Sequence, residues 1–235
     1  MDAGEAGGKI AVTLEAPRMV FGSTTKGTCT YLRLEQQRDC KNLQESNYDF
    51  TFHQSKATPN SMTPAQRHHS QGMSLYGSGE YQRAIEEFSQ TIELDPQYGE
   101  AYYVRGLSYA NLGQYERAIQ NYDKAIELDP QLDLAYANRG VSYDELGQYE
   151  KAIEDYDKAI ELEPQFAQAY ASRASSYFLL QQDERAIEDY NQAIQIDPND
   201  GYAYYWRGQA HSQVGNSAQS AKDLAKAEEL GYEPD

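Results

Sequence analysis

The sequence has few cysteines, tryptophans and basic residues, and it contains no long apolar run. Among 235 residues there are two cysteines and one tryptophan, and 20 Lys and Arg stand against 37 Asp and Glu. No stretch approaches the roughly 18 consecutive apolar residues of a membrane span, and the first residues lack the pattern of a secretory signal. Cys29 and Cys40 are the two cysteines, and cytosolic thiols usually stay reduced. We therefore expect a cytoplasmic protein without a structural disulfide.

The deficit of basic residues is confined to one part of the chain. Residues 1–60 contain seven basic and seven acidic side chains, which leaves 13 basic against 30 acidic from residue 61 onward. Phosphate backbones and anionic lipid headgroups need Lys and Arg for neutralisation. We therefore expect no nucleic acid and no membrane surface as a partner, and a protein or peptide ligand of apolar or basic character.

Motifs of catalytic and metal sites are missing as well. The sequence has no phosphate-binding Gly-rich loop, no HExxH, no CxxC and no nucleophile elbow. Cys29, Cys40, His53 and the pair His68 and His69 have a spacing that matches no closed zinc site. The acidic side chains on helices are expected to be exposed, and so to lack the desolvation that tunes a general acid. We predict a protein that is not an enzyme and has no catalytic residue, no cofactor and no metal.

What the sequence does contain is a repeat of 34 residues. Four prolines recur at this spacing, each after an acidic residue: Pro96, Pro130, Pro164 and Pro198. They define repeats over 65–98, 99–132, 133–166, 167–200 and 201–234, within a domain of 61–235. Because the residue before a proline is pushed out of helical geometry, each acidic–proline step predicts the end of one helical unit.

Small and bulky residues alternate within this frame in a way that predicts paired helices. Position 8 is small, as in Gly106 and Gly140, and position 24 is bulky, as in Tyr122 and Tyr156. Glycine inside a helix costs about 1 kcal/mol relative to alanine, so its recurrence predicts a close helix crossing. Gly113 stands between the two apolar stretches of helical period, where helices commonly end in a left-handed residue. Each repeat therefore reads as a helix-turn-helix.

These positions resemble the tetratricopeptide repeat family over residues 65–234. Repeats two and three carry the small-8, aromatic-11, Ala-20, aromatic-24, Ala-27 and Pro-32 pattern without an insertion. The departures from it are Thr91, Gln181, His211, Ser220 and Tyr232. The resemblance implies an all-α, right-handed superhelical solenoid of antiparallel helix hairpins that acts as a protein-interaction scaffold or adaptor.

The resemblance also implies where a partner would bind. The first helix of each repeat lines the concave face in this family, and ligand contacts fall mainly at positions 2, 5, 6, 9, 12 and 13. The candidate groove residues are Tyr103, Val104, Leu107, Asn138, Val141, Ser172, Phe178, Leu179, Tyr205 and Trp206. We expect an apolar helix or an extended segment of a partner against them. For Trp206, packing against repeat four is the alternative to a role as a binding anchor.

The residues at these positions bear on two other recognition modes of the family. The carboxylate clamp of the family needs Lys and Arg on both sides of a central asparagine. Asn138 is present, but Tyr103, Leu107, Gln168 and Ser172 take the flanking places, so no clamp is expected. Arginine recurs at position 7, in Arg105, Arg139, Arg173 and Arg207, where structural pairing with position 23, expected on the preceding hairpin, is favoured over binding of an acidic ligand.

Residues 1–60 form the remaining segment, which we expect to be mostly irregular. It has short apolar strips around Ile10 to Leu14 and Tyr31 to Leu34, for which a small hairpin is one interpretation, and a mostly disordered or weakly folded segment is favoured over an independent domain. These strips are also candidates for an internal ligand of the groove. Two further alternatives to the scaffold remain: self-assembly through the terminal repeats into a homo-oligomer, and a regulatory subunit of an enzyme carried by a partner.

Overall fold

The computed structural model describes residues 62–234, which form ten helices joined by short turns. The helices are α1 (Pro64–Gly77), α2 (Tyr81–Leu94), α3 (Gly99–Asn111), α4 (Tyr115–Leu128), α5 (Asp133–Glu145), α6 (Tyr149–Leu162), α7 (Ala167–Leu179), α8 (Asp183–Ile196), α9 (Gly201–Gln213) and α10 (Ser217–Glu229). Each predicted repeat holds one pair of them, which confirms the all-α solenoid. The irregular segment expected at 1–60 lies outside the described residues.

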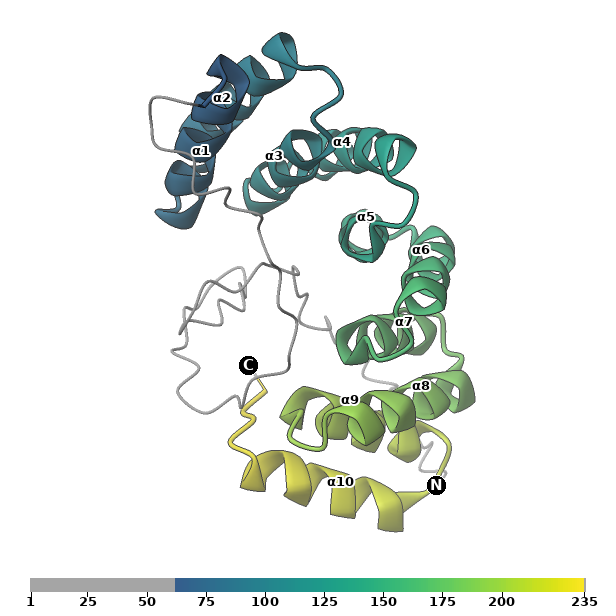
Figure 1. The fold of residues 1–235 in the computed structure, drawn as a ribbon. Helices are drawn as coiled ribbons and strands as arrows, with labels where there is room; N and C mark the ends of the chain where they lie inside the picture. Colours follow the sequence, from purple (N-terminus) through teal and green to yellow (C-terminus); the bar gives the residue numbers. More distant parts are fainter. Residues whose placement is uncertain (1–61, 235) are drawn as a thin grey trace, which may run out of the picture.

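The hairpins are stacked into an arc. Each helix packs against the next one in the sequence, and each odd-numbered helix also touches the next odd-numbered one. In Figure 1, α3, α5, α7 and α9 lie along the inner side of the curve, and α4, α6 and α8 lie along its outer side. The first helix of each repeat therefore lines the concave face, as the resemblance implied.

The turn within each hairpin depends on a left-handed residue. Gly113 has φ +70°, its N–H donates to Ala110 O at 2.9 Å, and the N–H of Gln114 donates to Tyr109 O at 2.9 Å. This pair of bonds closes the end of α3 as a Schellman motif. Gln181 takes the same place after α7 with φ +58°, which is costly for a residue with a side chain. Gln181, which departs from the repeat pattern of glycine at this place, thus occupies a position where the backbone geometry favours glycine.

The core is built from the predicted crossing of position 8 with position 24. A Cβ added at Gly106 would lie 2.6 Å from Cε1 of Tyr122, and one at Gly140 would lie 2.8 Å from Cε1 of Tyr156. Both tyrosines are fully buried. The glycines are therefore required by the approach of an aromatic ring from the second helix of the same hairpin.

Candidate partner-binding surface

The inner positions of the solenoid are less exposed than the sequence predicts. Seven of the ten candidate groove residues are buried in the structure: Tyr103, Val104, Leu107, Asn138, Val141, Ser172 and Trp206. The other three, Phe178, Leu179 and Tyr205, are half-buried. The seven therefore offer little surface to a partner. Partner contact by the ten residues remains a prediction, and the proposal below rests on the three that are half-buried.

The burial has a physical cause in the close approach of neighbouring inner helices. Asn138 on α5 donates its amide to Tyr103 Oη on α3 at 3.1 Å and to Leu134 O at 2.9 Å. The ring of Tyr103 in turn lies 6.0 Å from that of Tyr122. Positions 5 and 6 of successive repeats thus pack against one another. The Asn138 amide, the one element of a carboxylate clamp in the sequence, is used inside the protein.

An aromatic cluster lies between α7 and α9. The Trp206 ring is 5.5 Å from Phe178, 6.2 Å from Tyr202 and 5.3 Å from Tyr205, measured between centroids. Since Phe178 belongs to repeat four, the packing alternative for Trp206 is observed. Trp206 is only 3% exposed, and its indole N–H has no hydrogen-bond partner among the described residues. A buried donor without an acceptor is costly, and this one sits beside the half-buried Phe178 and Tyr205.

Charge on the inner face is of one sign. Its six contact positions in five repeats contain Glu100, Asp144 and Glu145, and they contain no Lys or Arg. Burial lowers the pKa of His69, at position 5 of the first repeat, to about 4, so this side chain is neutral at pH 7. Burial also raises the pKa of Glu100. The inner surface of the described repeats is therefore apolar and acidic.

A polar network that the sequence analysis missed lies beneath this surface. Tyr156 Oη donates to Asp144 Oδ2 at 2.8 Å, and Ser176 Oγ donates to Asp144 Oδ1 at 2.8 Å. The carboxylate thereby joins α5, α6 and α7. The sequence held a signal for this network, because only repeat three has Asp at position 12.

The arginine ladder is structural, as favoured, but its pairing differs from the expectation. Arg139 forms two hydrogen bonds with Asp155 of its own hairpin, at 2.8 and 2.6 Å, and a third at 2.6 Å with Asp123 of the preceding hairpin. The position-23 partner therefore lies on the same hairpin as the arginine, because the two helices of a hairpin are antiparallel. The residue at position 25 of the preceding hairpin provides the second partner. The same pattern links Arg105 with Asn121 and Ser89, Arg173 with Asp189 and Asp157, and Arg207 with Asp223 and Asn191.

The C-terminal end of the array differs in composition from its interior. Positions 21 and 28 are isoleucine in each of the first four repeats and become Ala221 and Glu228 in the fifth, where both are exposed. At the other end, position 3 is a fully buried alanine in repeats two to five and is the exposed Arg67 in repeat one. Both end faces thus lack the residues by which inner repeats pack together.

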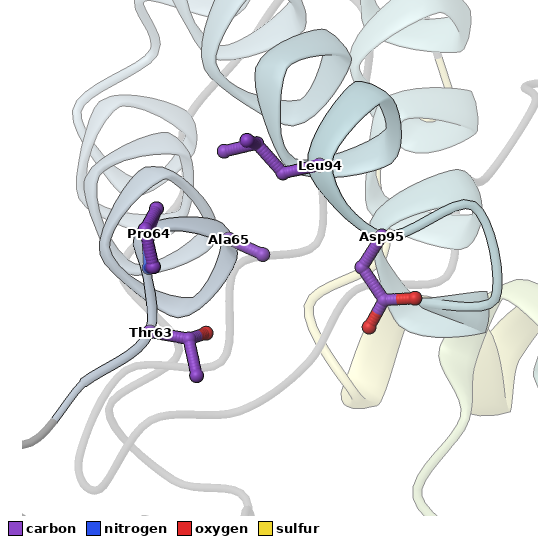
Figure 2. Close-up of a pocket in the computed structure, with 5 residues that line it drawn as sticks. All are labelled: Thr63, Pro64, Ala65, Leu94 and Asp95. Atoms are coloured by element: carbon purple, nitrogen blue, oxygen red, sulfur yellow. The ribbon is translucent and has the colours of Figure 1, made fainter.

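A small open pocket remains at the first hairpin. It is lined by Thr63, Pro64, Ala65, Leu94 and Asp95, which come from the start of α1 and the end of α2 (Figure 2). Leu94 is 52% exposed there. The pocket is shallow, and Asp95 is the only charged residue in its lining.

Between residues 62 and 234 no three His, Cys, Asp or Glu side chains gather as metal ligands. None of the ten described helices combines the length and the apolar character needed to cross a bilayer.

The geometry defines a class of protein: a curved solenoid of helix hairpins with an apolar, acidic inner surface. Family models agree with this class, since tetratricopeptide repeat models match residues 69–133 and 134–166, and a TPR repeat model matches residues 174–215. The chain belongs to the tetratricopeptide repeat family. A comparison with curated proteins finds no match.

Solved structures share the fold. A crystal structure of MamA is 27% identical with a TM-score of 0.65, and the match covers 68% of this chain and 94% of that one. MamA 41-end from Desulfovibrio magneticus RS-1 is 23% identical with a TM-score of 0.68, covering 72% and 96%. YrrB, described as a TPR protein with an unusual peptide-binding site, is 21% identical with a TM-score of 0.62, covering 71% and 86%.

Proposed function

We propose that this protein is a non-catalytic scaffold that binds a peptide segment of a partner along its inner face. The observation that carries the proposal is the composition of that face, whose contact positions hold half-buried apolar side chains and three carboxylates and no basic residue. A segment with apolar side chains and at least one Lys or Arg complements both features. The peptide-binding site ascribed to YrrB is a use of the same fold that agrees with this proposal. The scarcity of cysteine supports a cytoplasmic place of action.

The proposed contact centre is formed by Phe178, Leu179 and Tyr205. These three are the candidate groove residues that keep part of their surface accessible. Phe178 and Tyr205 flank Trp206, with ring centroids 5.5 and 5.3 Å from it, so a bound apolar side chain would add to an aromatic cluster that is already formed. Aromatic anchors of this kind commonly dominate the energy of an interface.

A titration with defined peptides tests the proposal. Labelled peptides of equal length that pair leucine with lysine, or leucine with glutamate, are added to the full chain at increasing concentration, and fluorescence anisotropy reports binding. The lysine peptide is expected to bind at least about tenfold more tightly, because the inner carboxylates attract it, and its binding should weaken with salt. Equal affinity for both peptides contradicts the proposed chemistry.

A pair of variants locates the binding. Phe178→Ala with Tyr205→Ala removes the accessible aromatic surface and is expected to abolish binding of the lysine peptide. Leu94→Ala with Val214→Ala removes two exposed apolar side chains, at the end of α2 and directly after α9, that occupy none of the six contact positions of the inner face, and it is expected to leave binding unchanged. Circular dichroism checks that both variants keep their helices. If the control pair weakens binding as much as the aromatic pair, the inner face is not the site.

A further inference from the structure

We propose that the segment around Tyr31–Leu34 of this same chain occupies the inner face and competes there with external partners. The inference rests on the proposed function, since it needs the inner face to accept an apolar and basic segment. It goes beyond that function because it makes the protein its own competitive inhibitor.

The chemistry of the segment fits the surface. Residues 26–41 read KGTCTYLRLEQQRDCK, with four Lys and Arg against two Asp and Glu. Tyr31, Leu32 and Leu34 supply apolar side chains around Arg33. The chain from residue 61 onward carries 13 basic and 30 acidic side chains. Within residues 1–60, this stretch joins apolar side chains with a positive excess, which is the pairing that the inner face favours.

The length of chain between the segment and the solenoid permits the contact. Residues 42–61 provide 20 residues before Met62. A flexible chain of that length has a root-mean-square span of about 25 Å and a fully extended reach of about 65 Å. Helices of neighbouring repeats pack at about 10 Å, so the three steps from α1 to α7 and the four steps from α1 to α9 are roughly 30 and 40 Å. Both distances are somewhat longer than the root-mean-square span and well below the extended reach, so the chain is long enough for the segment to reach Phe178 and Tyr205.

Trp206 gives an independent reason to place a ligand at this position. Its ring is nearly buried among Phe178, Tyr202 and Tyr205, yet its indole N–H finds no acceptor among the described residues. The donor is itself buried, so a bound segment must displace a covering side chain to reach it. A backbone carbonyl brought there would pair with the indole and remove the cost of the unsatisfied group.

The tethered segment is expected to weaken the binding of a competitor by a factor that can be calculated. A segment tethered by a flexible linker of this length has an effective concentration on the order of 1 mM. If the free segment binds with a dissociation constant of about 10 µM, the tethered copy weakens any competitor by a factor of about 100. The protein would then bind only partners that exceed its own segment in affinity or concentration.

The test uses the full chain and one probe. The probe is a labelled peptide of residues 26–43 with both cysteines replaced by serine. Its affinity is measured for the full chain, for the variant Leu32→Asp with Leu34→Asp, and for the matched control Ile10→Asp with Val12→Asp, which changes the other apolar strip. The proposal expects the probe to bind the first variant at least tenfold more tightly than the full chain, the control to match the full chain, and Phe178→Ala with Tyr205→Ala to abolish binding in each background. Trp206, the single tryptophan, is expected to become more accessible to acrylamide quenching in the first variant alone.

Other results separate this inference from the proposed function. Equal and inner-face-dependent binding of the probe to all three chains overturns the internal occupancy and leaves the scaffold function standing. If the probe does not bind but the lysine peptide binds the full chain, the internal occupancy is likewise overturned and the scaffold function stands. Probe binding that survives the loss of Phe178 and Tyr205 places the segment elsewhere and overturns the inference. Failure of both the probe and the lysine peptide overturns both proposals.

Discussion

Tyr122 and Tyr156 occupy the same place in consecutive repeats, and replacing each with phenylalanine is expected to change stability in opposite directions. Both side chains are fully buried against a glycine of the facing helix. Tyr156 Oη donates to the Asp144 carboxylate at 2.8 Å, whereas Tyr122 Oη has no partner among the described residues. Burial raises the pKa of both phenols well above the ordinary value, so both are neutral at pH 7.

The expected magnitudes follow from these contacts. Tyr156→Phe removes a hydrogen bond to a charged group, which contributes about 1.5 to 3 kcal/mol to the free energy of unfolding. Tyr122→Phe removes a buried polar group without a partner, so a gain of about 1 kcal/mol is expected. Phe88 at the same position of repeat one is also fully buried, which indicates that a phenyl ring fits there. A change of 1 kcal/mol corresponds to roughly 2 to 4 °C in the melting temperature of a chain of this size.

Urea and thermal unfolding followed by circular dichroism at pH 7 measure both variants. The melting temperature should rise for Tyr122→Phe and fall for Tyr156→Phe, with a gap of about 5 °C or more. Neighbouring repeats share interfaces, so a local change is expected to move the transition of the array. A fall for both variants would mean that Tyr122 has an acceptor after all. No change for Tyr156→Phe would mean that the Asp144 network contributes nothing to stability.

Three further changes test other features of the structure. Gln181→Gly should raise the melting temperature, because the left-handed backbone there costs a residue with a side chain about 1 kcal/mol, and an equal or lower value would contradict the assigned strain. Asp200 caps α9 by accepting from the N–H of Ala203 at 3.2 Å, and burial raises its pKa to about 6. Because the folded state favours the protonated carboxyl, the contribution of this group to stability falls as pH rises from about 4 to 6. Asp200→Asn keeps the cap and should therefore add on the order of 2 kcal/mol above pH 6 and little below pH 4, as thermal unfolding across pH can check. Ala221→Ile with Glu228→Ile restores the packing residues of inner repeats on α10, so light scattering should show a monomeric parent and a variant that associates with rising concentration; a parent that already associates would favour self-assembly through the ends.

The fold was predictable because the same residue types recur at the same positions of successive repeats. Gly106 and Tyr122 predict a close crossing of two helices, Gly113 predicts a helix end, and the acidic–proline step at 129–130 predicts the start of the next hairpin. These signals depend on contacts within one hairpin, where the residue spacing fixes which side chains meet. The placement of the first helix of each repeat on the inner side of the arc came instead from the resemblance to the tetratricopeptide repeat family.

The accessibility of the inner face was not predictable in this way. Tyr103 is either accessible to a ligand or packed against Asn138, depending on how closely α3 approaches α5. The repeat pattern does not determine the rotation between hairpins that sets this distance. The partners of Arg139 show a related limit, because a bond to the preceding hairpin was expected from position 23, whereas Asp155 at that position lies on the same hairpin and Asp123 at position 25 makes the bond between hairpins. The sequence therefore places ten residues at the contact positions of the inner face, but it does not determine how much of their surface remains for a partner.

The contacts between hairpins also bear on how binding is controlled. Arg139 and Arg173 each join one hairpin to the next through charge-assisted bonds, and Asp144 joins α5, α6 and α7. Such links hold neighbouring hairpins in one arrangement, so the inner face is largely formed before a ligand arrives, which lowers the entropic cost of binding. A surface that is already formed has little scope for regulation by a change of shape. Competition from a segment of the same chain needs no such change, and it alters affinity through the length of the linker and the sequence around Arg33.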